Sequence, residues 1–281
     1  MIRLVILSTA LIAGLPAADL QTAMDRALAG RAGTAVVLDV DSGRILASYH
    51  PEVAARRLTR PGSAVKPFTL LALLASGSPP RSLICARKLQ IGSRRMDCSH
   101  PPTPDPFDAV AALAYSCNYY FATLAAGLRS SDLVETFTRA GLISRTGLYD
   151  GEAVGEITLP SSVEQRQLLA LGEANILITP LELVSAYRKL ALKKNRTVSE
   201  ALEAATEYGT ARLARPPGVK VAGKTGTASD PGNGQIHAWF AGYAPAESPR
   251  IAVMVFLEQG VGGRDAAPIA RQLIQAALPA P

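Results

Sequence analysis

The sequence predicts an α+β fold of the α/β sandwich type, in which an antiparallel five-stranded sheet is covered by terminal helices and joined to an all-helical subdomain. Strand-like apolar runs lie near both ends of the chain, in residues 33–49 and 219–257. Residues 107–202, between them, follow mainly the helical period. Strands from the two ends can therefore pair in one sheet, with the helical segment packed beside it.

The N-terminus has the pattern of an export signal. Arg3 precedes a short apolar stretch, residues 4–15, and small residues suited to cleavage follow it. We expect residues 1–18 to be a signal peptide, and an uncleaved anchor is the alternative, although the stretch is shorter than a membrane-spanning helix requires. The protein is then exported, to the periplasm or to the extracytoplasmic face of the inner membrane.

The first elements after the signal are a short helix, residues 20–28, and a β-hairpin, residues 33–49. Two apolar runs flank Asp41, Ser42 and Gly43, a combination typical of a tight turn. These two runs supply the first two strands of the predicted sheet.

A helix is expected to begin after Pro61 and Gly62 and to continue to Leu74. Pro67 falls in its first turn, where a missing N–H is tolerated. Residues 76–106 are rich in serine, proline and arginine, so we expect irregular structure there.

Further helices, with glycine interruptions, follow in the central segment, and three strands and a helix complete the chain. The strands are residues 219–228, 237–243 and 250–257, and the terminal helix is residues 265–278. The expected parts of the mature domain, residues 19–281, are an α/β part at 19–60 and 205–281 and a mainly helical part at 61–204.

Composition excludes several classes of protein. Of the 281 residues 48% are apolar and 19% are charged, so the chain can bury a sizeable core and is not disordered. The net charge is +6, but no basic run is interleaved with aromatic residues, and nucleic-acid binding is not expected. The basic balance suits contact with anionic envelope polymers and equally an ordinary solvated surface.

The cysteines predict one disulfide. Cys85 and Cys98 bracket residues 89–96, which have the pattern of two short strands around a turn. In an exported protein a disulfide between them is expected, with about 3 kcal/mol of stabilisation, and two reduced thiols are the alternative. Cys117 is left over. No metal site is expected, because no second cysteine or histidine pair joins the first two cysteines.

Ser63 and Lys66 form the first motif that carries chemistry. Three residues apart on a helix, they share one face, so the amine can reach the hydroxyl. A serine needs an adjacent base to become a nucleophile, and a lysine can be that base only if burial lowers its pKa by several units. The Ser63 N–H can also stabilise an oxyanion. The alternative is a surface serine beside a solvated lysine.

Ser116 and Asn118 form the second motif. They follow the helical run 109–115 and can face one cleft while Cys117 points away. Ser116 can pass a proton from the base to a leaving amine, and Asn118 can hold Lys66 and a substrate amide. A polar helix cap is the alternative.

The third motif lies on the strand expected over residues 219–228. It consists of Lys224, Thr225, Gly226 and Thr227. Strand alternation puts Lys224 and Gly226 on one face, and we expect Gly226 to let a substrate backbone approach, so that a peptide adds beside the strand. Lys224 and the threonine hydroxyls can bind a carboxylate, and the Thr227 N–H can be a second oxyanion donor. An edge strand protected by a lysine is the alternative.

The three motifs and their order resemble those of the penicillin-binding protein and serine β-lactamase superfamily. The resemblance covers roughly residues 33–278 and implies a β-lactamase/transpeptidase-like fold. It extends to the sequence around the motifs, at residues 60–69, 116–121, 172–183, 221–228 and 237–245.

The resemblance implies a serine-type D,D-transpeptidase or D,D-carboxypeptidase that takes part in peptidoglycan biosynthesis. Ser63 would be acylated by the D-alanyl-D-alanine end of a stem peptide, with Lys66 as base, Ser116 as proton relay and Asn118 as orienting group. The implied substrate-binding residues are Lys224, Thr225, Gly226 and Thr227. β-Lactams would inhibit by blocking Ser63. No metal or organic cofactor is implied, and a cell-wall synthesis protein is a candidate partner.

Two other functions fit parts of this pattern. A β-lactamase would need a carboxylate that activates water for deacylation, and Glu152, Glu156 and Glu164 lie in a plausible region without a recognisable motif. A non-catalytic penicillin sensor or scaffold could keep the fold, but it would tolerate loss of Ser63, Lys66 or Lys224, and all three are present.

Overall fold

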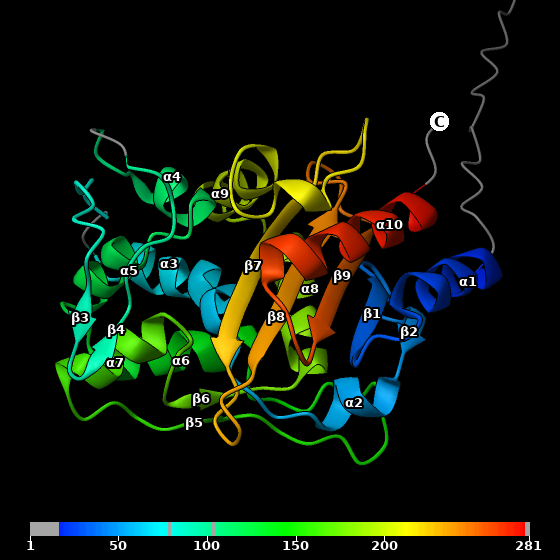
Figure 1. The fold of residues 1–281 in the computed structure, drawn as a ribbon, viewed down its shortest axis with the longest axis horizontal. Helices are drawn as coiled ribbons and strands as arrows, with labels where there is room; N and C mark the ends of the chain where they lie inside the picture. Colours follow the sequence, from blue (N-terminus) through cyan, green and yellow to red (C-terminus); the bar gives the residue numbers. More distant parts are fainter. Residues whose placement is uncertain (1–16, 78–79, 103–104, 279–281) are drawn as a thin grey trace, which may run out of the picture.

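An antiparallel sheet with strand order β2-β1-β9-β8-β7 crosses this computed structural model, which describes residues 17–77, 80–102 and 105–278 (Figure 1). The strands are β1 (Gly33–Asp39), β2 (Ile45–Tyr49), β7 (Ala222–Ser229), β8 (Ile236–Ala244) and β9 (Ile251–Leu257). The predicted fold class and the joining of both chain ends in one five-stranded sheet are confirmed. Residues 1–16 of the predicted signal peptide lie outside the described residues.

The two ends of the chain meet where β1 pairs with β9. Gly33 is opposite Leu257 and Asp39 is opposite Ile251, so the strands pair over their whole length. The hairpin predicted for residues 33–49 is formed by β1 and β2. Strand β2 of this hairpin is therefore one edge of the sheet, and β7 is the other edge.

Strand alternation gives the sheet two buried faces. In β1, Val36 and Leu38 pack in one hydrophobic core, and Ala35 and Val37 pack in another. Helix α8 (Pro180–Lys193) belongs to the first core, while α1 (Ala17–Leu28) and α10 (Ala267–Ala277) cover the second face, α10 crossing it in Figure 1. Because both faces are covered, the central strands β1 and β9 are almost continuously apolar.

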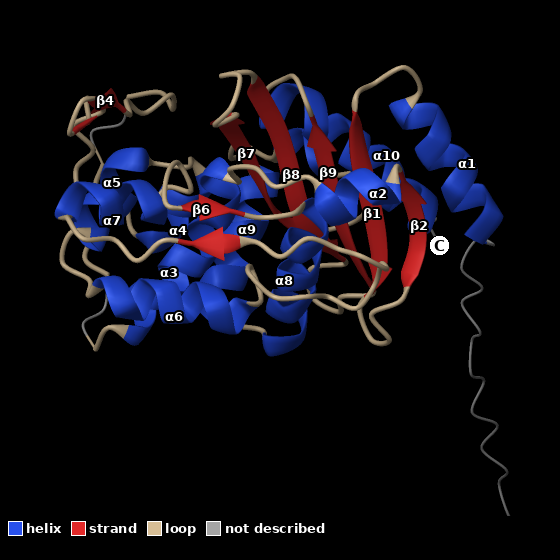
Figure 2. Ribbon diagram, turned by 90° about the horizontal axis from the view of Figure 1, so that it is seen from below, coloured by secondary structure: helices blue, strands red, loops and turns tan. Residues whose placement is uncertain are grey.

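A group of helices lies beyond the β7 edge of the sheet (Figures 1 and 2). The remaining helices are α3 (Lys66–Ala75), α4 (Ala109–Ala114), α5 (Asn118–Ala125), α6 (Ser130–Ala140), α7 (Val163–Ala170) and α9 (Arg196–Glu207), while α2 (Pro51–Arg56) packs against β1 and α8. Among the helices of the described ranges, none is both long and apolar enough to cross a membrane.

Short strands complete the structure. The hairpin expected between the first two cysteines is present as β3 (Gln90–Ile91) and β4 (Arg94–Arg95). A second pair, β5 (Glu156–Ile157) and β6 (Ile176–Leu177), was not expected, because two residues are too few to produce a recognisable alternation.

The helix expected after Pro61 begins differently from the prediction. Residues Gly62–Val65 form a 3₁₀ turn, and the α-helix starts only at Lys66. Pro67 has no N–H to donate to the Ser63 carbonyl, so this carbonyl accepts the N–H of Lys66 instead. Ser63 therefore lies on a tight turn in front of the helix that carries Lys66.

Tyr187 of α8 holds the turn that carries Ser63 by a hydrogen bond to its backbone. It is fully buried, and its hydroxyl donates to the Ala64 carbonyl at 2.8 Å. Tyr187→Phe should lower the free energy of unfolding by about 1–3 kcal/mol, because a buried carbonyl loses its donor. Urea denaturation would measure the loss. The control is Tyr208→Phe, at a tyrosine that is 44% exposed and should tolerate the change. Equal stabilities of the two variants would contradict this role.

Candidate active site

The segment that carries Ser63 is held by backbone contacts on both sides. The Gly62 N–H donates to the Gly172 carbonyl at 3.0 Å, and Trp239 Nε1 of β8 donates to the Arg60 carbonyl at 3.1 Å. Gly172 has φ +72°, and a Cβ there would collide with the Gly62 carbonyl. A glycine is thus required for this close approach, and it leaves Ser63 on a fixed turn with a partly exposed side chain.

Lys66 is fully buried, and its amine is surrounded by oxygen atoms. Nζ lies 2.8 Å from the Ser116 carbonyl, 3.2 Å from Ser116 Oγ and 2.6 Å from Asn118 Oδ1. Burial lowers the pKa of Lys66 to about 8, although nearby Cys117, Cys98 and Glu173 oppose the shift. A useful fraction of this amine is therefore neutral near physiological pH.

Ser116 and Asn118 meet Lys66 because of the backbone between α4 and α5. Ser116 has φ +57°, a left-handed conformation that is uncommon for serine and that turns its carbonyl and hydroxyl to the same amine. Asn118 is the first residue of α5, and its Nδ2 donates to the Met96 carbonyl at 3.1 Å. The structure therefore brings the first two motifs together, as the sequence predicted.

Lys224 on β7 joins the third motif to the same region. It is fully buried, and its Nζ donates to Thr210 Oγ1 at 3.4 Å and to the Thr225 carbonyl at 3.0 Å. Burial, together with the charge of Lys66, lowers the pKa of Lys224 well below its usual range. Thr225 Oγ1 also lies 3.1 Å from Thr210 Oγ1.

The expectation for Gly226 was wrong. A Cβ on Gly226 would lie 2.5 Å from the Pro61 carbonyl oxygen and 3.1 Å from Ala64, so the turn that carries Ser63 fills the space expected for a substrate. Gly226 instead allows β7 to pack closely against that turn. Thr227, next on the strand, accepts a hydrogen bond from the Gly262 N–H at 3.1 Å.

Sequence reasoning missed Thr210, which links the second motif to the third. It follows α9, and its N–H donates to the Ala114 carbonyl at 3.0 Å while its hydroxyl contacts Lys224 and Thr225. No motif marks this residue, so only the packing of α9 between α4 and β7 identifies it.

The glutamates considered for deacylation were Glu152, Glu156 and Glu164, and none of them is among the groups that act on the pKa of Lys66. The carboxylate of Glu152 accepts hydrogen bonds from Thr146 and from the Gly147 N–H. The carboxylate that acts on the pKa of Lys66 is Glu173, which forms an ion pair with Arg94 at 2.9 Å.

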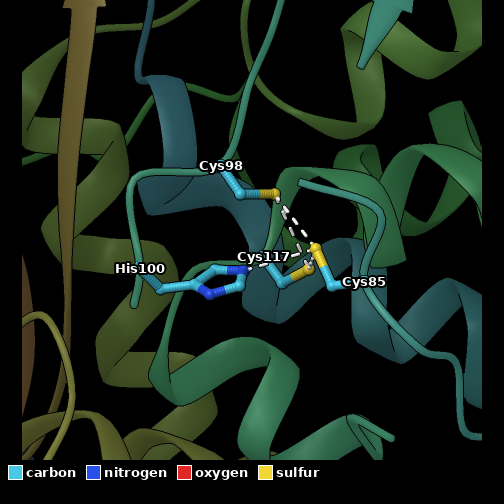
Figure 3. A group of neighbouring side chains, drawn as sticks. All are labelled: Cys85, Cys98, His100 and Cys117. Carbon is cyan, nitrogen blue, oxygen red and sulfur yellow. Dashed lines mark hydrogen bonds between the residues drawn. The ribbon is translucent and has the colours of Figure 1, made fainter. Parts of the chain in front are cut away.

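The three cysteines differ from the prediction as well. All are free thiols, so the expected disulfide between Cys85 and Cys98 is not formed. Cys117 and His100 join them, and the four side chains converge on one point (Figure 3). The premise that excluded a metal site, the lack of further cysteine or histidine ligands, is therefore wrong.

The penicillin binding protein transpeptidase domain matches residues 33–275 of the chain. The chain belongs to this family. It is similar to the peptidoglycan D,D-transpeptidase PbpA of Mycobacterium tuberculosis, with 27% identity over 88% of this chain and 67% of the relative. It is also similar to the peptidoglycan D,D-transpeptidase FtsI of Escherichia coli, with 28% identity over 83% of this chain. Of FtsI the alignment covers only 48%, about half.

The fold agrees with this membership. The crystal structure of Pseudomonas aeruginosa PBP2 in complex with WCK 5153 superimposes with a TM-score of 0.80 and 25% identity, covering 94% of this chain and 74% of that chain. The transpeptidase domain thus accounts for almost all of the described residues.

Thr210 offers a test of how the site is assembled. Thr210→Val keeps the shape but removes the hydroxyl that contacts Lys224, so we expect the free energy of unfolding to fall by about 1–3 kcal/mol. Labelling by a fluorescent penicillin should also slow, because Lys224 loses a fixed partner. Thr138→Val, at an exposed position of α6, is the matched control. Unchanged labelling and stability would remove Thr210 from the site.

Proposed function

We propose that this chain is a serine-type peptidoglycan D,D-transpeptidase that works through an acyl-enzyme on Ser63. The observation that carries the proposal is the fully buried Lys66, whose amine is bonded to both Ser116 and Asn118 one helical turn from Ser63. A buried amine with a lowered pKa next to a serine is the arrangement that nucleophilic catalysis requires. The relatives are named peptidoglycan D,D-transpeptidases, and the family resemblance of the sequence supplies the finer substrate class, the D-alanyl-D-alanine ends of stem peptides.

In the proposed acylation, neutral Lys66 accepts the proton of the Ser63 hydroxyl. Ser63 Oγ forms a bond with the penultimate D-alanine carbonyl carbon, and the amide C–N bond breaks. The proton passes through Ser116 to the leaving D-alanine amine, so charge and atoms balance. The N–H groups of Ser63 and Thr227 are the proposed oxyanion donors. Among the described contacts no hydrogen bond joins the Ser63 hydroxyl to the Lys66 amine, and substrate binding would have to bring these two groups closer.

Lys224 is the proposed anchor for the terminal carboxylate, with Thr225 and Thr227 beside it. A carboxylate arriving at this buried amine would favour the charged form of Lys224 and reverse the effect of burial on its pKa. Substrates without that carboxylate would then bind weakly, since the amine would stay unpaired.

The fate of the acyl-enzyme separates three activities. An amine of a second stem peptide gives transpeptidation, and water gives carboxypeptidation. Rapid water attack on a penicilloyl ester would make the protein a β-lactamase, but Glu173, the carboxylate that influences Lys66, is engaged by Arg94. Export to the extracytoplasmic side and a cell-wall synthesis partner stay predictions from the sequence.

A fluorescent penicillin tests the proposal directly. The wild-type protein should form an adduct that persists for hours, and peptide mapping should place it on Ser63. Ser63→Ala should not be labelled, whereas Ser93→Ala, at an exposed serine of the β3–β4 turn, should label normally. Fast release of hydrolysed penicillin would indicate a β-lactamase, and no adduct on the folded protein would indicate a scaffold.

The pH dependence of acylation tests the role of Lys66. Because its pKa is lowered to about 8, the neutral fraction rises roughly tenfold for each pH unit up to that value and then levels off. The labelling rate constant should follow this curve, with an inflection near pH 8. Lys66→Ala should abolish labelling at every pH while leaving the circular dichroism spectrum unchanged. Normal labelling of Lys66→Ala would eliminate this base.

A further inference from the structure

The side chains of Cys85, Cys98, His100 and Cys117, here called the Cys₃His cluster, converge on one point (Figure 3), and Cys117 lies within the second motif. Their ligand atoms all lie within 4.8 Å of one another. The Cys85 sulfur lies 3.6 Å from the Cys98 sulfur and 3.3 Å from the Cys117 sulfur, and the last two sulfurs are 3.8 Å apart. A tetrahedral zinc ion with Zn–S bonds of about 2.3 Å holds its sulfur ligands about 3.8 Å apart, so the spacing is close to that of such a site.

The histidine is oriented as a metal ligand. His100 Nδ1 lies 2.8 Å from the Pro101 carbonyl oxygen, which can only accept a hydrogen bond, so Nδ1 carries the proton. In the neutral imidazole the lone pair is then on Nε2, which lies 3.4 Å from the Cys85 sulfur. A backbone carbonyl that fixes one ring nitrogen while the other faces the ion is the usual support of a ligating histidine.

Each sulfur also receives a backbone N–H. Arg87 donates to Cys85 at 3.3 Å, Tyr119 to Cys98 at 3.3 Å, and Tyr120 to Cys117 at 3.4 Å. Such donors stabilise thiolates, the form in which cysteine binds metals.

Neither a disulfide nor three independent thiols accounts for this arrangement. A disulfide would use two sulfurs and leave the third thiol and His100 without a role. Cys98, His100 and Cys117 are at most 7% exposed, so the cluster is closed to solvent on most sides. Four converging ligands with no open position are typical of structural zinc sites, and three thiolates with an imidazole select a soft ion.

We propose that the Cys₃His cluster binds one zinc ion and thereby holds the second motif in place. Binding needs no redox step, because the thiols release their protons to solvent as Zn–S bonds form. Cys117 lies between Ser116 and Asn118, so a bond from its sulfur to zinc fixes the backbone on both sides of it. The left-handed conformation of Ser116, which directs two oxygens to Lys66, is the part that most needs such support.

Two of the other proposed ligands, Cys98 and His100, come from the segment that already contacts Asn118. Asn118 Nδ2 donates to the carbonyls of Met96 and Asp97, which precede Cys98 directly. Zinc would therefore bind together two segments that meet at Lys66, and its role is to position them. Zinc binding itself does not depend on the proposed function, but its effect on acylation does.

Metal content is the direct test. The full chain, purified without chelators, should contain about one zinc ion per molecule by mass spectrometry of the metal. After zinc removal, Co²⁺ should give the absorption bands of a tetrahedral site with cobalt–thiolate charge transfer. His100→Ala should weaken metal binding at least about tenfold, while Ser99→Ala, an exposed serine between two ligands, should bind like the wild type. His100→Cys should retain the metal, because it restores a fourth ligand.

Two results would overturn the zinc proposal: wild-type protein that is metal-free and gives no cobalt spectrum, or His100→Ala that binds as tightly as Ser99→Ala. Circular dichroism should first show that each variant is folded, because both measurements require folded protein.

Labelling by a fluorescent penicillin tests the positioning role. Removing zinc should slow acylation of the wild type and of Ser99→Ala, and adding Zn²⁺ back should restore it. The same addition should not restore His100→Ala. If the wild type is never labelled, the proposed function fails while the metal measurements still decide the zinc site. If labelling is identical with and without bound zinc, the positioning role is wrong.

Discussion

The burial of the Lys66 amine is the constraint on which the rest of the site depends. An amine without contact to water needs oxygen partners, and those it has come from Ser116 and Asn118, 50 and 52 residues further along the chain. The turn that carries Ser63 and the loop between α4 and α5 must therefore keep a fixed position relative to each other. Any shift of one against the other would leave a buried nitrogen unpaired, which makes the local geometry strongly determined.

Close backbone packing fixes the position of the turn that carries Ser63. Gly172 permits contact with the Gly62 carbonyl, and Gly226 permits contact with Pro61 and Ala64. The turn is thus enclosed between the helical part and the edge strand β7, without side chains to separate them. The same edge strand carries Lys224, so the group proposed to anchor the substrate and the proposed nucleophile are placed by one contact.

The Cys₃His cluster adjoins the loop between α4 and α5, which contains Cys117. Cys117 is one residue from each of the groups that bind Lys66, and Asn118 contacts the chain just before Cys98. Ordering of this cluster and of the second motif cannot be independent, because they share a backbone. A site built from loops can be rigid if a buried ion or network fixes those loops, and the proposed zinc would perform that task.

The sequence by itself determined the fold class, the joining of both chain ends in one sheet and the three motifs, because period and turn residues report backbone conformation locally. Tertiary structure alone decided what each side chain meets. It placed the Ser63 turn against Gly226 where a substrate was expected, and it identified Thr210 as a link between motifs. It also left Cys85 and Cys98 as free thiols and added His100 and Cys117 to them. Such convergence depends on contacts between residues far apart in the chain, and periodicity along a sequence carries no record of them.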